Sequence, residues 1–172
     1  MNRRLKSQGD LDGACFLYSI ANAVISLNDT VTAENWSRAI SSLPKSRSFL
    51  RQDVGTLAFN DNGEELERVA KRFLKSLSSN KFKVALHQGN RRSIERLIDE
   101  NAVVIISNPE HWFVVTEVHH DTVFAACSDT FNVHGHKHPE EPTPKFGHLS
   151  NLRMKLSDLR VFGRMAFRVT KA

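Results

Sequence analysis

The sequence predicts an α+β protein in which helices come first and an antiparallel sheet follows. Three observations carry this prediction. Apolar residues recur at helical spacing over 63–77, and β-branched runs occupy 102–107, 111–118 and 122–129, separated by short turns. The helical patterns precede the strand patterns along the chain, which is the order of an α+β fold rather than of an alternating α/β fold.

The first half of the chain contains three predicted helices. The first runs from Cys15 to about Leu27, and the second begins at Thr32, a helix N-cap residue, and runs to Ser42. Residues 43–61 look like a loop with weak helical turns. A helix over 63–77 follows, with its apolar side chains on one face.

The second half contains the predicted strands. A short strand covers 82–86, and a helix over 93–100 separates it from the β-branched runs. The runs at 111–118 and 122–129 form a hairpin about residues 119–121. A closing strand is expected over 161–169.

Composition indicates a single globular domain over residues 1–172. The chain is 40% hydrophobic, has two cysteines and carries a net charge of +5. It has no apolar run near the roughly 20 residues of a membrane span and no apolar signal segment, which predicts no membrane partner and a cytoplasmic protein, or one exported by a signal-independent route. Basic residues follow helix faces and are not interleaved with aromatic residues, so nucleic acid is not favoured as a partner. Oligomeric state is left open.

One cysteine lies where a Gly/Asp-rich loop runs into the first helix. Gly13 precedes Cys15, and the apolar helical segment begins there. Unpaired backbone N–H groups and the helix dipole favour thiolate at such a position, which makes the sulfur a usable nucleophile. A cysteine on an apolar helix is more often a small buried residue, so position alone does not settle its role. Cys127 lies within a strand pattern and is expected to be buried and inert.

A histidine and an aspartate lie symmetrically about the predicted hairpin turn. His111 is nine residues before His120, and Asp129 is nine residues after it. The pairing therefore places both at the open end of the hairpin. A carboxylate beside an imidazole fixes its tautomer and stabilises its protonated form.

These features together resemble a papain-like cysteine peptidase. The residues that carry the resemblance are Gln8, the Gly13-x-Cys15 helix start, the His111-Trp112 strand start and Asp129. The pattern is most similar to the compact bacterial branch that includes the bacteriocin-leader-processing peptidases. Gln8 lies seven residues before Cys15, where about six is usual, and Thr130 stands where the branch often has proline.

The resemblance implies a role for each residue. Cys15 is the nucleophile, His111 the general base and acid, Asp129 the orienting group, and the Gln8 amide an oxyanion donor worth roughly 3 kcal/mol. Asn132 is a second candidate for the orienting group. The expected chemistry uses a preformed thiolate–imidazolium pair, a thioester intermediate and a protein or peptide substrate, with no cofactor and no metal.

Three functions are compatible with this pattern. The first is a cysteine peptidase that hydrolyses a peptide or isopeptide bond. The second is a glutamine deamidase or transglutaminase-like effector that uses the same triad. The third is a non-enzymatic interaction domain, which the presence of all three triad residues disfavours.

A His/Pro-rich insertion at about 131–152 does not fit a minimal peptidase. It contains His134, His136 and His138, whose alternation is compatible with zinc or copper, although no cysteine accompanies them. Prolines and charges crowd the same stretch. We expect a mobile insertion beside the active site rather than a metal site.

Overall fold

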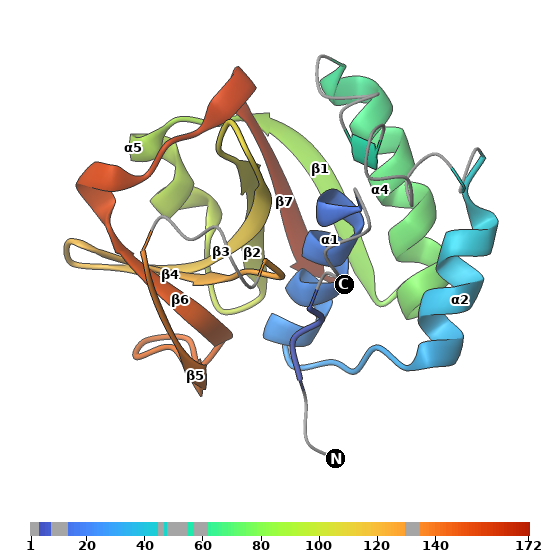
Figure 1. Ribbon diagram of the computed structural model, residues 1–172, viewed down its shortest axis with the longest axis horizontal. Coiled ribbons are helices and arrows are strands. Elements are labelled where there is room, and N and C mark those ends of the chain that lie inside the picture. Colours follow the sequence, from blue (N-terminus) through green and yellow to red (C-terminus); the bar gives the residue numbers. More distant parts are fainter. Residues whose placement is uncertain (1–3, 8–13, 45–46, 48–54, 57–61, 130–134) are drawn as a thin grey trace.

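The structure, a computed structural model, consists of a group of helices beside an antiparallel sheet (Figure 1). It describes residues 4–7, 14–44, 47, 55–56, 62–129 and 135–172. The three longest helices are α1 (Cys15–Ser26), α2 (Ala33–Ser42) and α4 (Gly63–Ser78). These agree with the predicted helices to within about one residue at each end. No helix among the described residues is both long and apolar enough to span a membrane.

Local sequence explains where these helices begin. The hydroxyl of Thr32 accepts a hydrogen bond from the backbone N–H of Asn35, and the Asn35 side chain accepts one from Thr32, which completes a capping box at α2. The Asn62 side chain caps α4 in a similar way by accepting from the N–H of Glu65. α1 has no such cap, because Ala14 precedes it.

The sheet has seven strands, and every pair is antiparallel. Its order is β1-β7-β2-β3-β4-β6-β5. The strands are β1 (Phe82–Gln88), β2 (Ala102–Ser107), β3 (Trp112–His119), β4 (Thr122–Ala126), β5 (His136–Pro142), β6 (Leu149–Lys155) and β7 (Met165–Lys171).

The short helices differ from the prediction. In place of one helix over 93–100, α5 (Arg91–Ile94) is followed by a 3-10 turn at Glu95–Leu97. α5 begins two residues earlier than expected, because Asn90 caps it by accepting from the N–H groups of Arg92 and Ser93. Two further 3-10 turns, Leu156–Asp158 and Phe162–Arg164, precede β7, so the closing strand begins four residues later than predicted.

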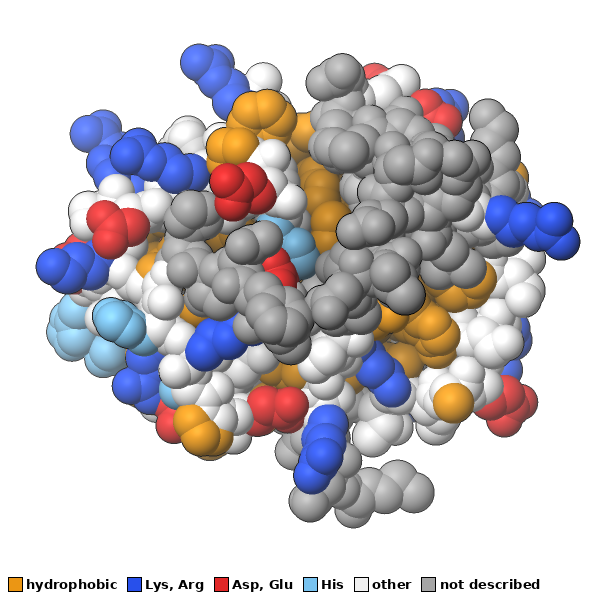
Figure 2. All heavy atoms as spheres, in the orientation of Figure 1, with side chains coloured by type: hydrophobic (Ala, Val, Ile, Leu, Met, Phe, Trp, Pro, Cys, Tyr) orange, Lys and Arg blue, Asp and Glu red, His pale blue; other side chains and the backbone are white. Residues whose placement is uncertain are grey.

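The sheet is apolar on both faces. One face packs against α1 and α4 and includes Val103, Ile105 and Phe167, whereas Val104 and Ile106 belong to a second cluster on the opposite face. Alternate side chains of a strand point to opposite faces, which is why every residue of β2 is buried. Figure 2 shows the Lys and Arg side chains of one face of the molecule spread around its rim, with acidic side chains between them.

The prediction of a mobile insertion over about 131–152 is wrong for the residues of that stretch that the structure describes. Residues 136–142 and 149–155 form β5 and β6, which extend the sheet beyond β4. The fully buried carboxylate of Glu117 accepts hydrogen bonds from the backbone N–H groups of Lys145 and Phe146, at 2.9–3.2 Å, and so ties the β5–β6 connection to β3. The charges and prolines suggested a loop, but they are those of an exposed edge strand.

Candidate active site

Cys15 is the first residue of α1. Its side chain is partly exposed, and its Sγ lies 3.7 Å from Oγ1 of the buried Thr56. No side chain of Ala14 caps the helix, and the first turn contains no acidic residue. The positive end of the α1 dipole favours negative charge on the thiol and on groups beside it.

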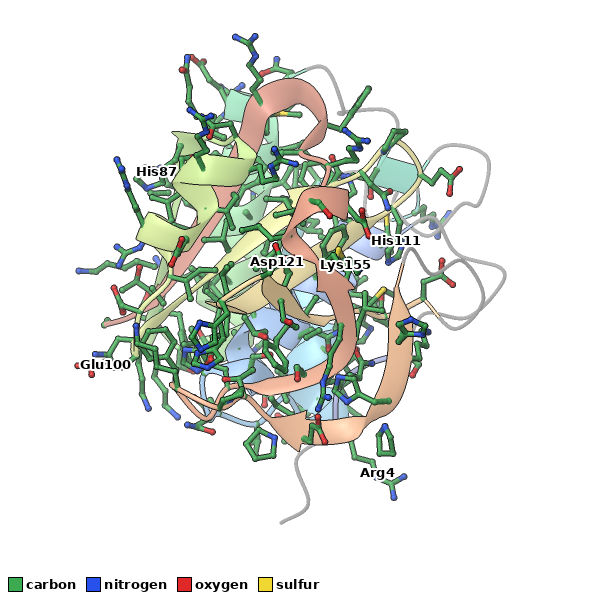
Figure 3. The ribbon with its side chains drawn as sticks, turned by 90° about the vertical axis from the view of Figure 1, so that its left-hand side faces the viewer. Arg4, His87, Glu100, His111, Asp121 and Lys155 are labelled. Atoms are coloured by element: carbon green, nitrogen blue, oxygen red, sulfur yellow. The ribbon has the colours of Figure 1, made fainter. Side chains whose placement is uncertain are left out.

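His111 is held by a tight turn between β2 and β3. Oδ1 of Asn108 accepts from the N–H groups of Glu110, at 2.9 Å, and of His111, at 2.7 Å. The N–H of Asn108 donates to the carbonyl of His111 at 3.0 Å. The imidazole is 9% exposed, and its Nε2 lies 3.5 Å from Oγ of Ser128. Figure 3 shows where His111 lies relative to the sheet.

Aromatic packing brings the start of α1 to the start of β3. The ring of Phe16 meets the ring of Trp112 edge-on, with centroids 4.8 Å apart, and Phe167 packs against both. Phe16 follows Cys15 in the chain, and Trp112 follows His111. The aromatic contact therefore holds the start of the helix that carries Cys15 against the start of the central strand β3, which His111 precedes.

Asp129 lies beyond the end of β4, not within it. β4 ends at Ala126, whereas the strand was expected to continue to Asp129. The turn is also tighter than expected: His119 pairs with Thr122, and His120 adopts a positive φ of 53°.

A β-bulge shifts the register of β3 and β4 to the one that the prediction assumed. The tight turn alone would shift the pairing by one residue, but the register changes between Val115 and Glu117. Beyond the bulge Val114 pairs with Ala126, and the same register continued outward places His111 opposite Asp129. The charge of Asp129 acts on the imidazole of His111 accordingly.

The electrostatics of His111 differ from the expectation. Burial lowers its pKa to about 4; Asp129 raises the pKa in part, and the cation of Lys137 lowers it further. The imidazole is thus neutral at pH 7, which is the reverse of the expected preformed thiolate–imidazolium pair. A neutral imidazole can still act as a general base, taking the proton of Cys15 when the substrate binds.

Cys127 lies close to the same groups, but in a different environment. It is 5% exposed, and burial raises its pKa to about 11, although the N–H of Asp129 donates to its sulfur. The Asn151 side chain bonds both the N–H and the carbonyl of Cys127, at 2.9 Å each. The thiol is therefore protonated and shielded, as the strand pattern predicted.

Two predicted residues lie outside the described part of the chain: Gln8, the expected oxyanion donor, and Asn132, the alternative orienting group. Sequence reasoning missed Thr56, Ser128 and Lys137, which adjoin the site. Only long-range contacts bring Thr56 and Lys137 there, so no local pattern could have found them. Among the described residues, no group of three or more His, Cys, Asp or Glu side chains could hold a metal ion.

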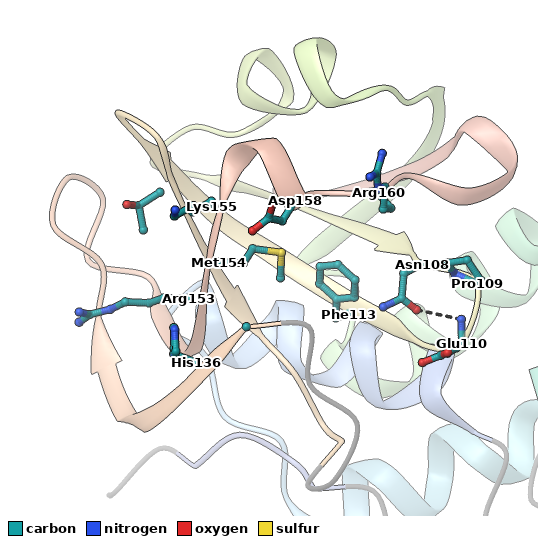
Figure 4. A pocket seen from close by; sticks show the side chains of 12 residues that line it. Asn108, Pro109, Glu110, Phe113, His136, Arg153, Met154, Lys155, Asp158 and Arg160 are labelled. Carbon is teal, nitrogen blue, oxygen red and sulfur yellow. Dashed lines mark hydrogen bonds between the residues drawn. The ribbon is translucent and has the colours of Figure 1, made fainter.

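A pocket of about 800 Å³ opens beside the His111 turn (Figure 4). Phe113 and Met154 provide apolar walls, and Lys155, Asp158 and Arg160 provide charged ones. Asn108, Pro109 and Glu110 of the turn also line it. The pocket is therefore directly joined to the loop that carries His111.

Comparison with known proteins identifies the class of fold. No protein-family model and no curated protein matches the chain. Among solved structures, it resembles a double glycine motif protease from an AMS/PCAT transporter, solved in complex with the leader peptide, at a TM-score of 0.53 and 9% identity over 98% of this chain and 91% of that one. It also resembles the peptidase domain of Streptococcus ComA, a bifunctional ABC transporter involved in quorum sensing, at a TM-score of 0.54 and 9% identity over 99% and 100%.

The chain thus has the fold of these two peptidases. The likeness confirms the predicted α+β fold, with helices packed on a C-terminal antiparallel sheet, as one that peptidase domains adopt.

Proposed function

We propose that the protein is a cysteine peptidase that hydrolyses a peptide bond through Cys15, His111 and Asp129. The observation that supports the proposal is the contact between Phe16 and Trp112, which joins the helix start at Cys15 to the strand start that follows His111. The likeness to two solved peptidases supports a peptide substrate, one of them having been solved with a leader peptide.

The reaction needs four steps from these side chains. His111 takes the proton of Cys15, and the sulfur attacks the carbonyl carbon of the scissile bond. N–H groups at the start of α1 stabilise the resulting oxyanion, with Gln8 as the proposed side-chain donor. His111 then protonates the leaving amine, and water hydrolyses the thioester. Asp129 holds the imidazole in the tautomer that allows both transfers.

The solved relatives also suggest which peptides to test. One of them is a double glycine motif protease, so peptides that contain two adjacent glycines are the first choice. Incubation with the wild-type protein should yield two fragments in the mass spectrum, and Cys15→Ala should yield none. Intact peptides in every case would argue against a peptidase of this specificity.

The same experiment tests the alternative chemistry. A glutamine deamidase would leave the peptide backbone intact and add about 1 Da at glutamine, and a transglutaminase-like enzyme would add an amine there. Glutamine-containing peptides in the set, analysed with Cys15→Ala as the control, separate these outcomes from cleavage. An unmodified set, together with an unreactive Cys15, would favour the interaction domain.

A further inference from the structure

The Lys137 side chain on β5 has neither an ion pair nor a hydrogen bond with another described residue. On this strand Glu140 accepts a hydrogen bond from the backbone N–H of Leu5 at 3.1 Å, and Glu141 pairs with Arg153. Lys137 is exposed, and none of the ion pairs within the described ranges involves it. Within the described ranges, no carboxylate is paired with its exposed ammonium.

The strand register places this lysine on the face of the sheet that carries Cys127. Lys137 pairs with Leu152 of β6, which in turn pairs with Ala125 of β4. Residues directly opposite one another in an antiparallel pair point to the same face, so the Lys137 side chain lies on the face that carries Leu152 and Ala125. Cys127, two residues after Ala125, belongs to the same buried cluster on that face.

The charge of Lys137 acts on His111 and on the buried Cys127. It lowers the pKa values of both His111 and Cys127. Two groups that follow β4 also act on the imidazole: Oγ of Ser128 lies 3.5 Å from its Nε2, and the charge of Asp129 raises its pKa. Of the charged groups that act on His111, Asp129 favours the imidazolium and Lys137 opposes it.

A cation beside the general base hinders the reaction unless an anion neutralises it. We propose that Lys137 binds a carboxylate of the substrate near the scissile bond, and that this contact helps His111 to accept the proton of Cys15. The proposal rests on the proposed peptidase function. An acidic residue in the substrate would then contribute twice, to binding and to the proton transfer.

The first test needs no substrate. Iodoacetate and iodoacetamide alkylate a thiolate by the same displacement of iodide, but only iodoacetate carries a carboxylate. We expect Lys137→Met to lower the ratio of the iodoacetate rate to the iodoacetamide rate at Cys15 roughly threefold to tenfold, and Lys137→Glu to lower it further. Lys137→Arg should keep the ratio, and added salt should reduce it in the wild-type protein.

Lys83 provides the matched control. It is an exposed lysine on β1, at the opposite edge of the sheet, so Lys83→Met changes the net charge equally without changing the site. Peptide mapping assigns the label to Cys15 rather than Cys127. A ratio that is the same in the wild type, Lys137→Met and Lys137→Glu would overturn the proposal.

The second test uses paired peptides that contain two glycines and differ only by Glu or Gln at one position near the scissile bond. At one position the wild type should cleave the Glu peptide faster than the Gln peptide. This preference should disappear in Lys137→Met. Lys137→Glu should instead cleave fastest a peptide with Lys at that position. A Glu preference that survives Lys137→Met would refute the assignment. If no peptide is cleaved by the wild type, the proposed function fails, and the alkylation ratio alone decides whether Lys137 forms an anion site.

Discussion

The two cysteine side chains of the protein lie in two different environments. Cys15 stands at an uncapped helix start and is partly exposed, whereas Cys127 follows a central strand and is 5% exposed, with a pKa raised to about 11. The two thiols are close enough for Cys15 to contribute to that raised pKa. The difference teaches that the backbone element and the burial of a thiol decide which cysteine can act as a nucleophile, even within one site.

The largest expected effect separates the two cysteines by mutation. Cys15→Ala should lower kcat/KM at least 1,000-fold, on the order of 4 kcal/mol, because no other group can form the thioester. Cys127→Ala should keep kcat/KM within about threefold and lower the free energy of unfolding by about 1 kcal/mol, since it removes only buried packing. Equal losses of activity in the two variants, measured on one cleaved peptide, would contradict the assignment of Cys15, rather than Cys127, as the nucleophile.

The next effect concerns the group that orients the imidazole. Asp129→Ala should lower kcat/KM by roughly 10- to 1,000-fold without abolishing it, because the nucleophile and the backbone donors of α1 remain. Asn132→Ala is the matched control and should cost little. A larger loss for Asn132→Ala than for Asp129→Ala would transfer the orienting role to Asn132 and show that the register does not continue beyond β4.

A third effect appears in acid. His111 has a pKa of about 4 when folded and 6.5 as its ordinary value, so the unfolded chain binds the extra proton first as the pH falls. Stability should therefore be lost between pH 6.5 and pH 4, by up to roughly 3 kcal/mol, and should be retained above pH 6.5. Urea unfolding of the wild type and of His111→Gln across this range measures the loss.

The control for that experiment compares how the free energy of unfolding changes with pH in the wild type and in His111→Gln. His111→Gln removes the titrating group, so its stability should vary less with pH over the same window. Parallel pH curves for the two proteins would mean that burial does not hold the imidazole neutral. In the wild type, the acid limb of kcat/KM should also lie near pH 4 rather than near pH 6.5, since the base fails only when it is protonated.

The sequence predicted the regular elements better than their connections. The apolar period of α4 and the cap at Thr32 are local signals, and both helices begin where these signals stand. β5 was missed because an exposed edge strand has no buried face, and its prolines and charges mimic a loop. In place of the helix expected over 93–100, the chain forms α5 and a 3-10 turn. In so short a stretch, a periodic pattern does not distinguish one helix from these two pieces.

The candidate site shows the same division. The helix start at Cys15 and the strand start at His111 were readable from residue types, and the opposition of His111 and Asp129 followed from counting about the turn. That counting assumed a three-residue turn, whereas the chain has a tighter turn and a compensating bulge at Thr116. Lys137 was not found, because its place depends on the pairing of β5 with β6.

The most direct test of the central claim is the rate at which each cysteine of the folded protein reacts with iodoacetamide near pH 7. With a pKa of about 11, only about 1 in 10,000 Cys127 thiols is thiolate at that pH, and burial shields it further. The account predicts that peptide mapping finds the label on Cys15 at least about 100 times faster than on Cys127. Equal rates, or faster labelling of Cys127, would contradict the claim that the start of α1 makes Cys15 the nucleophile.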